Sequence, residues 1–416
     1  MENKIKIDFD KTFKNYSSND ELGFKKNNLE NFLKEGLPGR KLESWKFSDL
    51  NQIINKNIGE LNFYIDPSKE NLIDNALIIK DFDHNKIVFI NGKVEELDFS
   101  FEDKDKVKIL KEFEISTKIK SKNSLLNLNN AFCKNFYKIN ISKNYTMNKP
   151  LIIYHVSTNN ISSTTLNSQL NFILEENSSL KIVDLYEDKS EKNFINIFYN
   201  FTLHENVILK NFKIDKSQNN NIKYSYNNID QSENSVSETF ILSNGSKFLK
   251  NEINCNLNGQ YSSAFINGVF SLDSDKHHEI RTSVNHLVEN TKSYQLIKSV
   301  LDDKSKSVYQ GKIYVSPDAQ KTDGYQLSKC ILLDKNTEFN AKPELEIYAD
   351  DVKCSHGSAS GSLNENSIFY LRSRGLNYKQ AKKLLISGFF LDVIEKITDE
   401  EIKNFIKRTM ELNQWI

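Results

Sequence analysis

The chain has 416 residues, which is enough for roughly two or three structural units that each bury a core. Its 56 Lys and Arg residues balance its 56 Asp and Glu residues, so its net charge gives no reason to expect a nucleic acid or an anionic membrane as a partner. Hydrophobic residues make up 38% of the chain, and no apolar run approaches the roughly 18 residues of a membrane span, so we expect a soluble protein.

The N-terminal part, up to about residue 65, is predicted to be helical or irregular. Residues 1–16 mix acidic and basic side chains and have neither an apolar signal core nor the composition of a transit peptide, so we expect a cytoplasmic protein. Residues 28–34 have helical spacing, and Trp45 and Leu50 supply an apolar anchor after a Pro-Gly break. This pattern predicts a small helical cap.

Two short runs with strand composition follow, over residues 76–82 and 86–94. The second run contains Asn91-Gly92, which is a strong signal for a tight turn. We therefore expect a small mixed α/β segment, and we place the boundary of the N-terminal region at residue 104.

Residues 105–370 consist mainly of short alternating strands with almost no helical periodicity. A loose motif recurs, in which charged residues precede an Asn, Ser or Gly bend and a hydrophobic strand follows. Repeated strand-and-bend units favour a parallel β-helix, because each turn can bury its inner face against the next one. The repeat spacing is irregular, so periodicity alone leaves a β-sandwich open.

The last part of the chain, residues 371–416, changes to a helical period. Asn377 and Gln380 can cap one helix, and Thr398 and Glu401 form a capping box for a second. The expected apolar faces are Ala381, Leu385, Phe389, Val393 and Ile397 in the first helix, and Ile402, Phe405, Ile406, Met410 and Leu412 in the second. These helices either pack on the end of the β unit or form a docking surface.

The sequence lacks the common motifs of nucleotide chemistry and hydrolysis. It contains no phosphate-binding loop, no dinucleotide fingerprint, no H-E-x-x-H and no G-x-S-x-G. We therefore expect a protein that is not an enzyme and that takes any energy input from a partner.

The four cysteines, Cys133, Cys255, Cys330 and Cys354, are far apart and form no C-x-x-C pair. Their spacing predicts neither a disulfide framework nor a self-contained metal site, and it is typical of a reducing compartment. The first three are interpreted as small buried hydrophobic residues.

Cys354 and His356 are the candidate metal ligands. Residues i and i+2 of a strand point to the same face, so this thiol and this imidazole would lie side by side. Two ligands do not complete a metal site, and a buried Cys beside a hydrogen-bonded His is the simpler interpretation of the same pattern. Asp350 and Asp351, just upstream, are predicted to shape a turn.

A second cluster contains His277, His278 and His286, of which the last two share strand parity. Histidines without a ligand role are the favoured interpretation of this cluster.

The segment from Tyr309 to Leu376 resembles the C-terminal core of the SufB/SufD family, and residues 277–301 resemble the part that precedes it. Leu37 to Leu50 is similar to the short Trp-containing element of the SufD branch, and Lys-Cys-Ser-His-Gly at 353–357 also follows that branch. The resemblance implies a right-handed parallel β-helix, mainly β, flanked by an N-terminal helical and α/β segment and by C-terminal helices. It also implies a scaffold that works with SufB-like and SufC-like proteins in iron-sulfur cluster assembly.

By the same resemblance, His356 takes part in an interfacial site with a SufB-like protein, and Cys354 is its neighbour. The site would hold iron or a nascent iron-sulfur cluster transiently, and this chain alone would bind no cofactor permanently. The helices from Tyr378 to Ile416 would dock the SufC-like ATPase. A shared site of this kind suits a cluster that must be released, because a full set of thiolates from one chain would hold it more firmly.

Three alternatives stay open at this point. A β-helix of this kind could be a carbohydrate-active enzyme, which would need paired carboxylates and bases on neighbouring turns. It could also be a purely structural partner of SufB-like and SufC-like proteins, with no metal role. The unpaired edges of the β-helix could further allow a homodimer in isolation.

Overall fold

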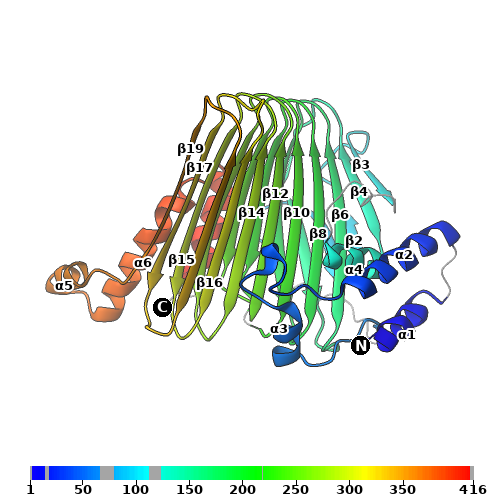
Figure 1. The fold of residues 1–416 in the computed structure, drawn as a ribbon, viewed down its shortest axis with the longest axis horizontal. Coiled ribbons are helices and arrows are strands. Elements are labelled where there is room, and N and C mark those ends of the chain that lie inside the picture. The colour runs from blue at the N-terminus through cyan, green and yellow to red at the C-terminus, as the bar shows by residue number, and fades with distance from the viewer. Residues whose placement is uncertain (1, 15–17, 66–78, 112–122, 218, 413–416) are drawn as a thin grey trace.

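The protein is a β-solenoid made of two sheets, and helices pack on the outer face of each sheet (Figure 1). The computed structural model describes residues 2–14, 18–65, 79–111, 123–217 and 219–412. In spatial order, the ten-stranded sheet contains β19 (Lys353–Gly361), β17 (Asp323–Leu332), β15 (Lys292–Leu301), β13 (Ser263–Leu272), β11 (Val236–Ser243), β9 (Ile208–Asp215), β7 (Ser179–Asp188), β5 (Leu151–Ser157), β1 (Asn85–Ile90) and β2 (Lys93–Asp98). The nine-stranded sheet contains β18 (Glu338–Ile347), β16 (Lys306–Val315), β14 (His277–His286), β12 (Phe248–Leu257), β10 (Ile222–Gln231), β8 (Phe194–Leu203), β6 (Thr165–Leu174), β4 (Phe136–Ile141) and β3 (Val107–Lys111).

Successive turns of the solenoid stack in parallel register. Phe248 pairs with His277, and His277 pairs with Lys306, so a side chain recurs at the same place one turn later. Bends between strands contain asparagines in the left-handed region, with φ of 57° at Asn177 and 58° at Asn206, which Asn tolerates better than most residues. These bends confirm the recurring motif, and the parallel pairing of strands from successive turns decides for the solenoid over the sandwich.

The two ends of the solenoid differ. At the N-terminal end, β1 and β2 form an antiparallel hairpin, and β3 pairs antiparallel with β4. The expected tight turn is present at Asn91 and Gly92, whose φ values are 50° and 80°. At the other end, β18 and β19 are the last strands of their sheets in the described structure. This second end is called the open end below.

Helices cover the outer faces of both sheets. The N-terminal cap comprises α1 (Glu2–Thr12), α2 (Asn19–Glu35), the 3-10 turn η1 (Glu43–Trp45), α3 (Leu50–Asn57) and α4 (Ser124–Phe132). Trp45 and Leu50 are buried there, as predicted, and the cap packs on the nine-stranded sheet. The C-terminal helices are α5 (Glu365–Ser373), α6 (Tyr378–Ile394) and α7 (Glu400–Leu412), and the last two pack on the ten-stranded sheet. Among the described residues, no helix has the length and apolar character needed to cross a membrane.

The strand expected over residues 76–82 is wrong for its described part. Residues 76–78 lie outside the described residues, and 79–84 form no strand. Instead, Ile79 donates its backbone N–H to the Tyr154 hydroxyl at 3.0 Å, and the ring of Phe82 lies 5.9 Å from that of Phe405 in α7. Tertiary packing against the C-terminal helix has outweighed local β propensity here.

The C-terminal helices are present, but two of their details differ from prediction. Asn377 and Gln380 form the expected capping box of α6. Its buried face is Ala381, Ile386, Phe390, Val393 and Ile394, whereas Leu385 and Phe389 are only half-buried. A strict i, i+4 series rotates by about 40° around a helix at each step, so the predicted face drifted away from the true one.

The capping box predicted for the second helix is also wrong. Asp399 caps α7, because its Oδ1 accepts the backbone N–H of Ile402 at 3.1 Å. The Thr398 hydroxyl instead donates to Glu238 on the sheet at 3.0 Å. A tertiary hydrogen bond has therefore moved the helix start by one residue.

Candidate functional site

Cys354 and His356 lie in β19 at the open end. In the parallel register, Cys354 pairs with Gly324 and His356 with Gln326 of β17. Gln326 is buried inside the solenoid, so the matching side chains of β19 also face the interior. Because β19 is the last described strand of its sheet, His356 is exposed while Cys354 is half-buried. The structure thus places the two predicted ligands on one face, at the mouth of the solenoid.

Cys354 packs closely against the preceding turn. Its Sγ lies 3.4 Å from the point that a Cβ on Gly324 would occupy. It belongs to a small apolar cluster with buried Ile313 and Val315 and partly buried Leu345. Burial raises the pKa of the Cys354 thiol, which disfavours the thiolate that binds metals. These surroundings fit the simpler interpretation as a packed apolar side chain, and they make Cys354 a weaker candidate ligand than His356.

A hydrogen-bonded chain runs inward from the rung behind His356. The Tyr309 hydroxyl lies 3.1 Å from Oε1 of both Gln326 and Gln295. The Thr282 hydroxyl donates to Gln295 Oε1 at 2.5 Å, and Gln326 Nε2 donates to a backbone carbonyl of β18 at 3.4 Å. Gly311 makes room for this chain, because a Cβ there would overlap both Gln326 Oε1 and the Tyr309 hydroxyl. The floor beneath His356 is therefore polar and fixed.

Sequence reasoning missed Gln326 and Tyr309 in this floor. No local motif marks them, since they come from strands β17 and β16. The one available signal in the sequence was that Gln326 precedes His356 by about the length of one solenoid turn. That signal can be used only once the register is known.

The segment before β19 forms a bend, as predicted for Asp350 and Asp351. The backbone N–H of Val352 donates to the Asp350 carbonyl at 3.2 Å, and that of Asp351 donates to Gln320 Oε1 at 2.9 Å. Both aspartate side chains are exposed. They shape the turn that leads into the candidate site.

The histidine cluster in β14 does not join this site. His278 is buried, with Nδ1 2.9 Å from the Ser243 hydroxyl and Nε2 2.9 Å from the Ser246 carbonyl. His286 is buried between the hydroxyls of Thr291 and Ser293, at 2.7 and 2.9 Å. Burial lowers the pKa of both histidines to about 4. The interpretation as ordinary structural histidines is therefore confirmed for these two.

The remaining cysteines are also structural. Cys133, Cys255 and Cys330 are buried, as predicted, and burial raises the pKa of the last two to about 12. Within the part of the chain that the structure describes, no three His, Cys, Asp or Glu side chains come together as a metal site.

A buried ionic cluster inside the solenoid was not predicted. Asp184 accepts from Lys213 Nζ at 2.7 Å and lies 3.0 Å from His155 Nε2. Burial alone would raise the pKa of Asp184, but Lys213 and His155 outweigh it and hold that pKa well below its usual value. The cluster is sealed by the core, so it stabilises one arrangement of the interior and offers no route to a substrate.

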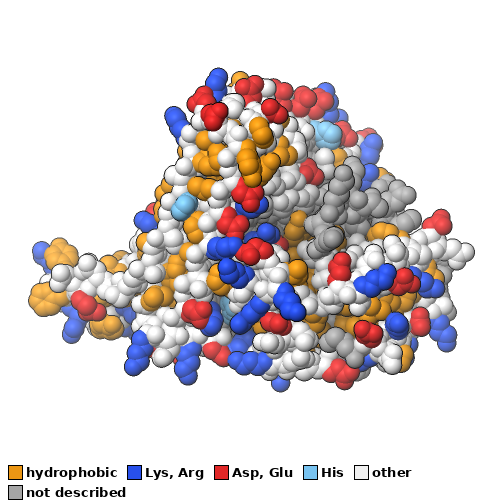
Figure 2. All heavy atoms as spheres, viewed as in Figure 1, with side chains coloured by type: hydrophobic (Ala, Val, Ile, Leu, Met, Phe, Trp, Pro, Cys, Tyr) orange, Lys and Arg blue, Asp and Glu red, His pale blue; other side chains and the backbone are white. Residues whose placement is uncertain are grey.

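Two further surfaces are left uncovered in the described structure. At the open end, β18 and β19 present strand edges, beside the exposed Ile347 and Tyr348, with 37% and 62% of their surface accessible. At the C-terminal side, α5 projects from the body of the molecule (Figure 1). Phe369 and Tyr370 on this helix are 74% and 57% exposed, and Figure 2 shows hydrophobic side chains gathered on this projection. Both surfaces have the character of interaction sites.

Residues 155–389 match the family model described as SUF system FeS cluster assembly, SufBD core domain. The chain belongs to the SufBD family. The matched part of this SufBD protein begins in β5 and ends in α6, so it includes most of the solenoid and the segment with Cys354 and His356.

Individual relatives agree with this family. The chain is 28% identical over 383 residues to the iron-sulfur cluster assembly protein SufD of Escherichia coli K12, covering 90% of this chain and 89% of that protein. It is 27% identical over 241 residues to the chloroplastic protein ABCI7 of Arabidopsis thaliana, covering 57% and 51%. It is 39% identical over 124 residues to an iron-sulfur cluster assembly SufBD family protein of Synechocystis, covering 30% and 26%. The chain is thus a SufD-like iron-sulfur cluster assembly SufBD family protein.

Proposed function

We propose that this chain is a non-catalytic scaffold subunit that pairs with a SufB-like protein through its open end. The observation that carries the proposal is the last rung of the solenoid, where His356 faces inward yet is exposed, between two strand edges with no described neighbour. Such edges are completed by strands of another chain. A SufB-like solenoid meeting this end would enclose His356 at the interface, in the cytoplasm.

Iron or a nascent iron-sulfur cluster is the cargo of this interface. His356 is the principal ligand that this chain supplies. Cys354 is the weaker, second ligand, because its thiol is partly buried and its raised pKa disfavours the thiolate that binds metals. The partner chain supplies the remaining donors. Since two donors cannot hold a cluster that usually takes four, the cargo is held transiently and only in the complex.

The C-terminal region docks a SufC-like ATPase, which supplies the nucleotide chemistry that this chain lacks. The exposed Phe369 and Tyr370 of α5, together with Tyr378 at the start of α6, support this assignment. Nearby Arg372 and Arg374 can pair with acidic groups on the partner. ATP-driven movement of the ATPase would then pull on α5 and α6, which follow β19 directly along the chain.

The central experiment is co-expression with the SufB-like and SufC-like proteins of the same genome, followed by anaerobic iron and sulfide analysis of the purified complex. We expect His356→Ala to leave the complex intact and to lower bound iron and sulfide. The matched control is His204→Ala, because His204 is also exposed but lies at a bend far along the chain. Normal iron and sulfide in an intact His356→Ala complex would instead support the purely structural role.

Each docking surface has its own test. Ile347→Lys with Tyr348→Lys should prevent co-purification of the SufB-like protein, and Phe369→Ser with Tyr370→Ser should prevent that of the SufC-like protein. Tyr261→Ser is the control, because this tyrosine is 56% exposed at a bend elsewhere. Retention of either partner at full strength would contradict the surface assigned to it. Sedimentation of the isolated chain, with and without the first pair of changes, tests whether the open end also forms a homodimer.

The carbohydrate-active alternative is less well supported. Acid-base pairs on neighbouring turns do exist, as in Lys250 and Glu279, whose Nζ and Oε2 are 2.6 Å apart. Both of these side chains are buried beneath the N-terminal cap, where Lys250 lies over the Trp45 ring. A polymer cannot reach them. Hydrolysis of polygalacturonate by the isolated protein would nevertheless restore this alternative.

A further inference from the structure

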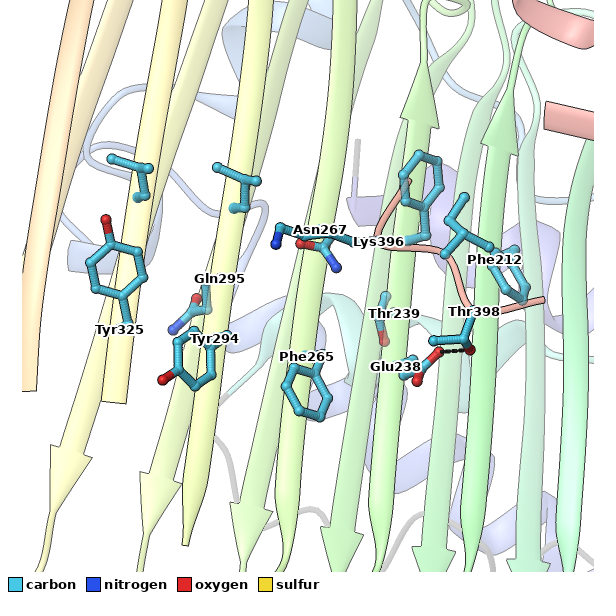
Figure 3. A pocket seen from close by; sticks show the side chains of 14 residues that line it. Phe212, Glu238, Thr239, Phe265, Asn267, Tyr294, Gln295, Tyr325, Lys396 and Thr398 are labelled. Atoms are coloured by element: carbon cyan, nitrogen blue, oxygen red, sulfur yellow. Dashed lines mark hydrogen bonds between the residues drawn. The ribbon is translucent and has the colours of Figure 1, made fainter. Parts of the chain in front are cut away.

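A groove lies on the outer face of the ten-stranded sheet, whereas His356 faces the interior. The volume of the groove is about 600 Å³. Figure 3 shows the side chains that line it. Strands β11, β13, β15 and β17 form its floor, and the turn between α6 and α7 forms one wall. A volume of this size is within the range of small-molecule sites.

Aromatic side chains form the floor of the groove in register. Phe265 pairs with Tyr294, and Tyr294 pairs with Tyr325, so the three rings lie on successive turns. The centroids of the first two are 6.2 Å apart with planes inclined by 16°, and those of the last two are 6.1 Å apart. Tyr294 is 41% exposed, and Leu296 and Leu327 line the next row. The floor is therefore a broad aromatic surface that is open to a ligand.

The wall of the groove supplies polar groups. Figure 3 shows the side chain of Lys396 extending from the α6–α7 turn across the groove towards Asn267. Among the described residues, the Lys396 ammonium group has no hydrogen-bond or ion-pair partner. Glu238, by contrast, accepts from Thr398, whose hydroxyl also accepts from Lys210 at 2.6 Å. Glu238 therefore faces the Lys210 cation, which is opposite it in the strand register and donates to the same Thr398 hydroxyl, whereas Lys396 is left available to a ligand.

We propose that this groove binds a small molecule that combines a flat aromatic ring system with an anionic group. The rings lie over Phe265 and Tyr294, where stacking is favourable, and the anion lies against Lys396. A neutral apolar ligand would leave the lysine unused, and a cationic ligand would find no carboxylate without a hydrogen-bond partner here, because Glu238 accepts from Thr398 and Asp323 accepts from Tyr294. This proposal is independent of the role proposed for the open end.

Two dyes of nearly equal shape test both halves of this proposal. 1-Anilinonaphthalene-8-sulfonate carries a sulfonate, and N-phenyl-1-naphthylamine is its neutral counterpart. We expect saturable binding of both dyes to the full chain by fluorescence titration, with one site per chain and tighter binding of the sulfonate. Tyr294→Ser should weaken both dyes about tenfold or more. Lys396→Met should weaken only the sulfonate, by about threefold.

Tyr314→Ser is the matched control, because Tyr314 also stands on an outer sheet face beside another tyrosine, with ring centroids 5.8 Å apart, but on the nine-stranded sheet. It should leave both affinities unchanged, and circular dichroism should show all variants folded. Equal losses with Tyr294→Ser and Tyr314→Ser, or binding that does not saturate, would overturn the site. An equal effect of Lys396→Met on the two dyes would overturn the anionic class of ligand. Complete loss of dye binding in the assembled complex would show that the groove is a protein interface instead.

Discussion

The buried histidines of β14 make the stability of this protein depend on pH in a defined window. Both His278 and His286 have a folded-state pKa of about 4, lowered from 6.5 by burial. A backbone carbonyl can only accept a hydrogen bond, so the contact with Ser246 requires a proton on Nε2 of His278. Because the pKa of His278 is about 4, Nδ1 carries no proton at neutral pH and accepts from the Ser243 hydroxyl. The folded protein therefore holds His278 in its neutral form.

The sign and size of the effect follow from linkage. Below pH 6.5 the unfolded chain takes up protons on these histidines, whereas the folded chain does not, so stability falls as the pH drops from 6.5 to about 4. A shift of this size corresponds to about 3 kcal/mol for each histidine. Between these pH values, each should contribute a slope of up to about 1.4 kcal/mol per pH unit. Above pH 6.5 the slope from these two groups should vanish.

Urea unfolding followed by far-UV circular dichroism at pH 7.5, 6.5, 5.5 and 4.5 measures this slope. His278→Gln and His286→Gln should each make the free energy of unfolding lower at pH 7.5 and its pH dependence flatter below 6.5. The control is His204→Gln, since an exposed histidine should not change the slope. A double variant with the wild-type slope between pH 6.5 and 4.5 would refute the reasoning.

Two other substitutions test the packing of the interior. Gly311→Ala should destabilise the fold by about 1–3 kcal/mol, because its new methyl group would overlap Gln326, and Gly361→Ala, with open space around it, should cost little by the same urea assay. Asp184→Asn should lower the free energy of unfolding by about 3–5 kcal/mol, because Lys213 and His155 lose their carboxylate partner. Removing the carboxylate of the exposed Glu338, which pairs with Lys306, should lower it by only about 0–1 kcal/mol. Equal losses for the two changes would contradict the idea that burial makes the difference.

Much of the fold could be predicted from local patterns. Alternating strands and Asn bends indicated stacked turns, and Asn91-Gly92 indicated the tight turn that joins β1 and β2. The spacing looked irregular because the connections vary in length: Ile222 pairs with Phe248 after 26 residues, whereas Lys306 pairs with Glu338 after 32. A fixed period is hidden when the turns differ in this way, although the register of the strands stays constant.

The candidate site was only partly visible in the sequence. The shared face of Cys354 and His356 follows from a two-residue spacing, which strand geometry translates directly into proximity. The polar floor from Gln326 and Tyr309 depends on the register between strands that are distant in the sequence. The use of Asp399 as the N-cap of α7 depends on a contact between Thr398 and the sheet. Interactions of this kind are set by tertiary structure, which no local pattern reports.

The unequal ends of the solenoid limit how far assembly can proceed. Within the described residues, the stack ends on one side in the antiparallel strands β2 and β3, and on the other in β18 and β19, which keep the parallel direction of the solenoid. A further rung in that parallel direction would therefore match β18 and β19, and not β2 and β3. A molecule with two open ends could stack without limit into a fibre. Under the pairing proposed above, a partner that meets β18 and β19 would leave only reversed strands at the far end, so the parallel stack would stop at two subunits. The reversed strands far from His356 would thus make such an end-to-end pair a finite particle.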